Sequence, residues 1–139
     1  MRKLTAFIAL GAAFAAAPSH AADPITGRWV TPEKDSVITI SKCGASYCGK
    51  LSKYLVPPEG GVDQRDVNNP NANLRKRKLL GISLLTGFKA EKDRWRGKIY
   101  DPRNGKTYKS FLKRKSPGVL EVKGCVGPFC QSQNWTRAR

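Results

Sequence analysis

The chain has 139 residues, of which 26 are Lys or Arg and 10 are Asp or Glu, so its net charge is +16 at pH 7. This length fits a single domain with one core, and the charge favours polyanionic partners. Nucleic acid is not the predicted partner, because no element carries aromatic stacking residues interleaved with basic ones. No segment reaches the ~20 apolar residues that a membrane-spanning helix needs.

The first 21 residues have the pattern of a secretory signal peptide. They begin with a basic pair, Arg2 and Lys3, and continue as an apolar run up to Ala17. Small residues then precede a predicted cut after Ala21, as a signal peptidase requires. The sequence therefore predicts an exported protein, periplasmic or secreted.

Cleavage at this point would leave residues 22–139 as one domain. The mature chain would carry 24 basic and 10 acidic residues, a net charge of +14. It would also lose His20, the one histidine of the sequence. Acid–base chemistry near neutral pH would then depend on carboxylates, tyrosine or lysine, and no serine has a recognisable activating partner. We expect a binding protein and not an enzyme.

From Gly27 onward, short β-rich runs alternate with turn residues, and no helical periodicity is sustained. Most connections are short enough for hairpins, with Asn104-Gly105 the clearest turn. The pattern predicts an all-β fold of eight antiparallel strands in up-and-down order. A chain this small would close them into a lipocalin-like barrel of the calycin type, with a flattened sandwich as the alternative. The expected strands are residues 27–31, 37–42, 47–54, 79–88, 94–101, 106–113, 119–125 and 129–137.

The two ends of this β domain carry a matching pair of motifs. Gly27 and Trp29 begin the first strand, while Trp135 and Arg137 end the last. The first and last strands of a closed meander are neighbours, so the Arg137 guanidinium can reach the Trp29 ring. This pattern is similar to that of lipocalins, in which an arginine near the end of the chain covers a Gly-x-Trp motif. We interpret these four residues as structural, closing one end of the barrel.

The four cysteines form two pairs of identical spacing, Cys43 with Cys48 and Cys125 with Cys130. In an oxidising compartment the favoured interpretation is two local disulfides, out of three possible connectivities. Each loop contains glycine, which suits a chain reversal. A tetrathiolate zinc site is the alternative, although zinc sites more often separate their cysteines by two residues. If both bridges form, a reductant should lower the melting temperature.

Residues 55–78 are too many for a hairpin and are rich in proline, glycine, asparagine and charge. Long loops within small domains are usually functional or mobile. Asn69 could cap one helical turn that starts at Pro70. The basic run from Arg75 to Lys78 is either an anion-contacting patch or a solvated loop end.

The candidate ligand-binding residues combine this loop with the fifth strand. Calcium is not predicted, because the oxygen-bearing residues of the loop lack the alternating carboxylates and closing glutamate of a calcium loop. No other metal and no cofactor is expected, and no catalytic residue is assigned. Asp101 is equally explained as a turn residue that accepts N–H bonds. The candidates are Asp66, Asn69, Arg75, Arg77, Trp95, Tyr100 and Asp101.

Seven ordered motifs together resemble the bacterial domain of unknown function family 2147. The resemblance spans nearly all of the predicted mature chain and implies an exported protein with a lipocalin-like barrel, without an established activity. One departure is Lys78, where the family tends to have proline before Leu-Leu-Gly. The motifs are Gly27-x-Trp29, Cys43 through Cys48-Gly49-Lys50, Asp66-Val67-x-Asn69-Pro70, Arg77-x-Leu79-Leu80-Gly81, Gly97-Lys98-Ile99-Tyr100-Asp101-Pro102, Asn104-Gly105-Lys106-Thr107-Tyr108 and Trp135-Thr136-Arg137.

Two binding functions follow from these patterns. In the first, which is the leading hypothesis, the barrel interior holds a small apolar or amphiphilic ligand, and the loop with Arg75 to Lys78 attracts its anionic head group. In the second, the barrel is filled and its basic surface docks onto an anionic glycan, lipid or protein of the envelope. A carboxylate-dependent enzyme is the remaining alternative. The protein is expected to be a monomer or a weak dimer.

Overall fold

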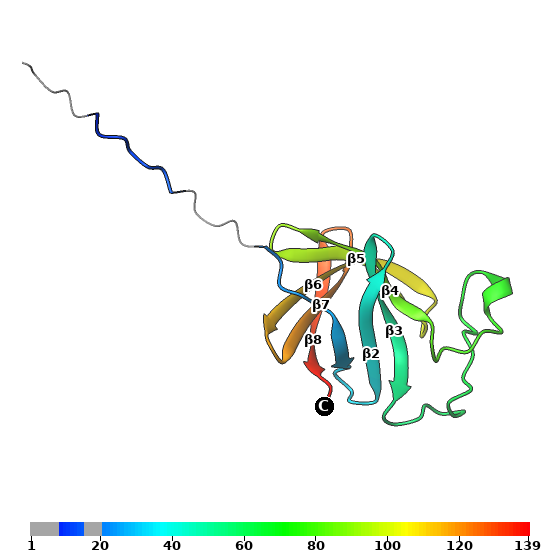
Figure 1. Cartoon of the computed structure of the whole chain (residues 1–139). Helices are drawn as coiled ribbons and strands as arrows, with labels where there is room; N and C mark the ends of the chain where they lie inside the picture. Colours follow the sequence, from blue (N-terminus) through cyan, green and yellow to red (C-terminus); the bar gives the residue numbers. More distant parts are fainter. Residues whose placement is uncertain (1–8, 16–20) are drawn as a thin grey trace, which may run out of the picture.

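Eight β-strands and one short 3₁₀ helix build the domain. The structure is a computed structural model that describes residues 9–15 and 21–139; most of the predicted signal peptide, with His20, lies outside this part. Figure 1 shows the strands wrapped around one axis. Their bounds are β1 Gly27–Val30, β2 Ser36–Cys43, β3 Ser46–Tyr54, β4 Ser83–Glu91, β5 Arg94–Asp101, β6 Lys106–Ser116, β7 Val119–Val126 and β8 Phe129–Arg137, and η1 spans Ala72–Leu74.

The strands close into an antiparallel up-and-down barrel, which confirms the predicted fold class. Each strand pairs with its neighbour in sequence, and β1 pairs with β8. The closing register places Trp29 opposite Arg137 and Val30 opposite Thr136. In this order successive turns alternate between the two ends of the barrel. The β1–β2 turn, the long loop, the β5–β6 turn and the β7–β8 turn therefore lie at one end.

Large apolar side chains fill the barrel, because alternate residues of each strand point inward. Trp95 and Ile99 share the inward face of β5 and pack against this core, as the alternation predicts. The interior is a packed core whose largest members are exposed by 3% or less. The buried cluster consists of Ile25, Trp29, Ile38, Ile40, Leu51, Leu79, Leu85, Phe88, Leu112, Leu120, Val122 and Trp135.

One end of the barrel is closed by Trp29 and Arg137, which we call the barrel floor. The Trp29 indole donates to the carbonyl of Ile25, 2.9 Å away, and the Arg137 guanidinium lies 4.1 Å from the centre of the Trp29 ring. Arg137 Nη1 also donates to the carbonyl of Thr26. A Cβ on Gly27 would overlap the Arg137 guanidinium, and the φ of Gly27 is +133°, so only glycine fits there. The structure brings Gly27, Trp29 and Arg137 into contact, and their role in closing the barrel stays a prediction.

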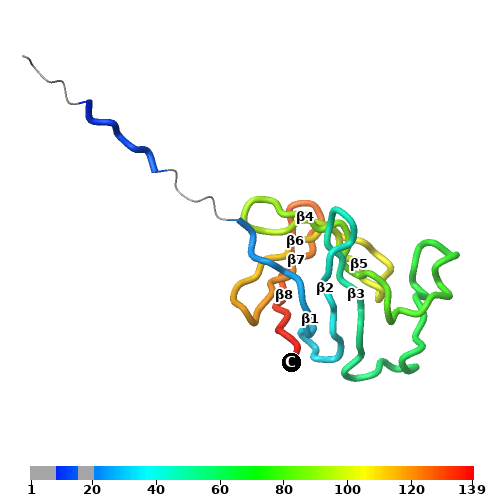
Figure 2. The backbone as a smooth tube through the Cα atoms, in the orientation of Figure 1, coloured from blue at the N-terminus to red at the C-terminus, as the bar shows by residue number. Residues whose placement is uncertain are grey.

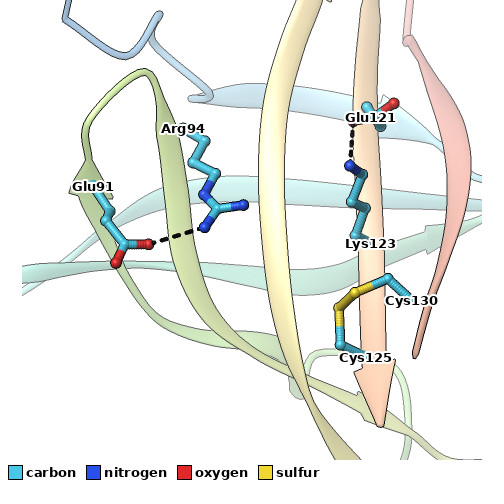
Figure 3. Close-up of a disulfide and its surroundings, with 6 residues drawn as sticks. All are labelled: Glu91, Arg94, Glu121, Lys123, Cys125 and Cys130. Carbon is cyan, nitrogen blue, oxygen red and sulfur yellow. Dashed lines mark ion pairs between the residues drawn. A yellow bond between two sulfur atoms is a disulfide. The ribbon is translucent and has the colours of Figure 1, made fainter. Parts of the chain in front are cut away.

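Both local disulfides are formed, as the sequence favours. Cys43 pairs with Cys48 across the β2–β3 turn, with Cα atoms 5.8 Å apart. Cys125 pairs with Cys130 across the β7–β8 turn, with Cα atoms 4.1 Å apart (Figure 3). The two bridges therefore hold hairpins at opposite ends of the barrel.

The long connection between β3 and β4 leaves the barrel wall and returns to it (Figure 2). Two local expectations for it differ from the structure. The cap of the helical turn is Asn71, whose Oδ1 accepts from the Asn73 N–H, while Asn69 forms a turn with the Asn71 N–H. The fourth strand begins at Ser83 and not at residue 79, because the preceding residues stay in the loop and bury Leu79.

No helix in residues 9–15 and 21–139 combines the length and apolar character needed to cross a bilayer.

Candidate functional site

The two arms of the long loop pair with each other before they meet the barrel. The Asp66 N–H donates to the carbonyl of Arg77, and the Leu79 N–H donates to that of Gln64. Arg65 and Lys78 form a β-bridge between these bonds. These backbone contacts place Asp66 directly opposite Arg77, although the two residues are eleven apart in sequence.

The Asp66 carboxylate is fully buried and is the centre of what we call the carboxylate hub. Its Oδ1 accepts the hydroxyl hydrogen of Tyr100 on β5, at 2.5 Å. Its Oδ2 accepts from Asn69 Nδ2 and from Arg77 Nε, each at 2.9 Å, and Arg77 Nη2 lies at the same distance. Both oxygens are therefore satisfied, as a buried charge requires.

The protonation states of Asp66 and Tyr100 in the hub do not change near neutral pH. Burial alone raises the pKa of Asp66, but the hydrogen bonds from Tyr100, Asn69 and Arg77, with the charge of Arg77, outweigh it and lower that pKa below the usual range. Burial and the hydrogen bond to Asp66 raise the pKa of Tyr100 to about 12. Asp66 therefore stays ionised and Tyr100 stays protonated, which suits a structural lock and not proton transfer at neutral pH.

A second contact fastens the loop to the β5–β6 turn. Asn68 Nδ2 donates to the carbonyls of Pro102 and Arg103, each at 3.1 Å. The Asn68 carbonyl lies so close to Gly105 that a Cβ there would overlap it, and Gly105 has a φ of +71°. The Asp66 and Asn104-Gly105 motifs of the sequence thus meet in space, and neither motif reveals this partner by itself.

A cavity of about 450 Å³ lies between the loop and the outer wall of the barrel. We call it the loop cavity. Arg77 uses Nε and Nη2 toward Asp66, 37% of its side chain stays exposed, and the residue lines this space. The lining residues are Asn69, Pro70, Arg77, Ile82, Ser83, Thr86, Tyr100, Gly105 and Thr107.

Five of the seven predicted ligand-binding residues gather at this site. Asp66, Asn69, Arg77 and Tyr100 form the hub, and Arg75 Nε donates to the carbonyl of Asn69, 2.7 Å away. Ser83 and Thr86 also line the cavity, but isolated small polar residues on a strand carry no motif. Thr107 belongs to the Asn104 to Tyr108 motif, which gives no sign that it lines a cavity.

The other two predicted residues lie apart from the hub. Trp95 is at the opposite end of the barrel, where it packs edge-on against Tyr47 and its indole donates to the carbonyl of Asp23. Asp101 accepts from the backbone N–H of Arg103 and pairs with its guanidinium, both at 3.0 Å. This is the turn role that the sequence offers for Asp101.

Across residues 9–15 and 21–139, no three His, Cys, Asp or Glu side chains are placed together to hold a metal ion. The arrangement at the hub agrees with this, because both oxygens of Asp66 already have protein donors.

Comparison with known families decides the classification. Residues 27–137 match a family described as an uncharacterised protein conserved in bacteria, domain of unknown function family 2147. The chain belongs to this family. The matched range begins at the Gly27 of the barrel floor and ends at its Arg137, so it covers the whole barrel with its long loop.

A solved structure supports the same fold. The chain is similar to protein HP1028 of Helicobacter pylori, described as belonging to the lipocalin family, with 25% identity, a TM-score of 0.73 and 84% of each chain covered. No curated protein sequence gives a significant match. A member of family 2147 with a lipocalin-like barrel is suited to binding a small ligand, and the family description names none.

Proposed function

We propose that this family 2147 protein is exported and binds a small amphiphile with an anionic group, in the loop cavity. The observation that carries the proposal is the guanidinium of Arg77, which the carboxylate hub holds at the wall of that cavity. An immobilised guanidinium can form bidentate hydrogen bonds to phosphate or carboxylate without a further entropic cost for its ordering.

Packing favours the loop cavity over the barrel interior. The interior is occupied by Trp29, Phe88 and Trp135, each exposed by 3% or less. A ligand there would have to displace close-packed side chains, which costs stability. The loop cavity is open without such a displacement, so we place the ligand there and not in the interior that the sequence analysis favoured.

The lining of the loop cavity suits an amphiphile. Pro70 and Ile82 offer apolar surface, and Thr86 and Thr107 offer hydroxyls beside Arg77. The basic run that ends the loop would add positive potential and raise the rate at which an anion arrives. Catalysis is not part of the proposal, because the carboxylate and hydroxyl of the hub do not titrate near neutral pH.

Export is supported by the signal pattern and by the two disulfides, which persist in oxidising compartments. We propose cleavage after Ala21, leaving 22–139 as the mature domain. N-terminal sequencing of the protein from the bacterial envelope should begin at Ala22. A chain that keeps Met1 in the cytoplasm would contradict export.

Native mass spectrometry of the envelope protein, compared with the denatured mass, tests for a bound ligand. Dodecyl phosphate and dodecanol can then be titrated as a matched pair, with the phosphate expected to bind more tightly. A Thr107→Phe variant fills the loop cavity and should lose this binding. Thr136→Phe makes the same change at an exposed strand position on β8 and should keep it. Equal binding by both variants would contradict the proposed site.

A further inference from the structure

The outer face of β4, β5 and β6 carries a second hollow, of about 920 Å³, which is lined by four cationic side chains. These are Lys89, Arg96, Lys98 and Lys109, and we call the hollow the basic groove. Glu91 is the acidic residue among its lining groups. The groove therefore concentrates positive charge on a barrel that is already strongly basic.

The cations of the basic groove face each other across the sheet. Lys89 is the register partner of Arg96, and Lys98 is the register partner of Lys109. Like charges directly opposite each other destabilise an antiparallel sheet. Two such pairs side by side lower the stability of the free protein, and a negative partner bound between them would relieve this repulsion.

Elsewhere on this surface, lysine side chains form ion pairs with carboxylates. Farther along β6, Lys113 lies 2.7 Å from Asp93 of the β4–β5 turn. Lys115 of β6 and Lys123 of β7 lie 3.4 and 3.6 Å from the two oxygens of Glu121. Figure 3 shows the Lys123 pair and the pair of Arg94 with Glu91. Within the described residues, Lys89, Lys98 and Lys109 have no carboxylate within 4.0 Å, although Arg96 shares Glu91 at 3.5 Å.

We infer that the basic groove binds a phosphorylated saccharide chain. Sheet geometry spaces the Cα atoms of these four residues about 5 Å apart between strands and about 7 Å apart along a strand, so their cations can contact several charges of one polyanion. A hollow is filled better by a flexible chain than by a flat bilayer surface. Tyr108 is the single aromatic residue of the lining, which is too few for a row of stacked bases, so nucleic acid fits less well.

Two threonines join the basic groove to the loop cavity. Thr86 and Thr107 line both hollows, so a chain can continue from one to the other along the outer wall. Their hydroxyls are suited to hydrogen bonds with sugar hydroxyls. This inference does not depend on the amphiphile proposed for the loop cavity.

The test compares two charge reversals of equal size. Lys98→Glu/Lys109→Glu changes the groove, and Lys50→Glu/Lys53→Glu changes exposed positions of β3 on another part of the wall. The probe is a phosphomannan oligosaccharide, with its dephosphorylated form and phosphatidylglycerol vesicles in parallel. The groove variant should weaken phosphomannan binding at least about tenfold, while the β3 variant changes it less than about threefold. The dephosphorylated form should not bind.

A second variant keeps the inference testable if the charge reversal disturbs folding. Lys98→Thr removes one like-charge pair, so it should raise the melting temperature of the free protein and weaken phosphomannan binding. Equal losses in the groove and β3 variants would mean that only global charge matters and would overturn the inference. Unchanged binding in the groove variant, or preference for the vesicles, would overturn it as well.

Discussion

Arg137 and Arg77 each lie over an aromatic ring, at opposite ends of the same barrel, with different duties. At the floor, the Arg137 guanidinium is 4.1 Å from the centre of the Trp29 ring and bonds to backbone carbonyls. At the hub, Arg77 is 6.0 Å from the centre of the Tyr100 ring and compensates the buried charge of Asp66. The floor is thus held by apolar burial, and the loop by paired charge. Removing a partner should therefore have different consequences at the two ends.

The largest expected effect is at the floor, through its aromatic ring. Trp29→Ala removes a fully buried side chain and should cost about 3–5 kcal/mol of unfolding free energy. Arg137→Met should cost less, about 0.5–2 kcal/mol, because it leaves the apolar contact in place. Urea unfolding measures both. If Arg137→Met costs as much as Trp29→Ala, burial does not dominate at the floor.

At the hub the order of the stability costs is reversed, and we expect removal of the arginine to cost more unfolding free energy than a change in the aromatic residue. Arg77→Met leaves the Asp66 carboxylate without its cation and should cost about 2–3 kcal/mol, moderated by the partial exposure of Arg77. Adding Asp66→Asn removes the uncompensated charge, so the double variant should regain part of the loss. The same unfolding measurement completes this double-mutant cycle. Strict additivity would show that the two residues do not interact.

The contributions of the hub and the floor to stability should also differ in their pH dependence. Because the pKa of Asp66 is lowered by folding, its contribution to stability is present above the unfolded value of about 3.9 and is lost as pH falls through the folded pKa. The gap in unfolding free energy between wild type and Asp66→Asn should therefore shrink from pH 7 to pH 2.5. The gap between wild type and Trp29→Ala should stay constant. A parallel decline of both gaps would contradict this assignment.

The smallest expected effect is at the tyrosine of the hub. Tyr100→Phe removes one hydrogen bond to Asp66 while Asn69 and Arg77 remain, so the cost should be about 1 kcal/mol. Thermal unfolding should show a modest decrease in melting temperature, with the loop still docked through Asn68. A loss as large as that of Arg77→Met would mean that the hydroxyl, not the cation, holds the loop.

The fold was largely predictable because its signals are local. Alternating residues and turn dipeptides such as Asn104-Gly105 predict the eight strands, and the Gly27, Trp29 and Arg137 motifs predict the closure. The beginning of β4 was misplaced, because Leu79 looks like a strand residue although it is buried under the loop. This burial depends on contacts with residues distant in sequence, which the alternation of residues along a strand does not reveal.

The candidate site was predictable only in part. Its loop residues were found by composition, but the burial of Asp66 depends on Tyr100, 34 residues away in sequence. The cap at Asn71 was missed for a related reason, because Asn69 is engaged with Asp66 and with the next turn. The basic groove required the strand register, which pairs Lys98 with Lys109.

The β7–β8 hairpin also determines how the molecule responds to a protease. Val126 and Phe129 are exposed at its tip, 65% and 80% respectively, so the turn between them is open to cleavage. Because Cys125 and Cys130 flank that turn, a cut inside it would leave both fragments covalently joined. The nicked barrel would migrate as one chain on a gel until a reductant separates its last strand.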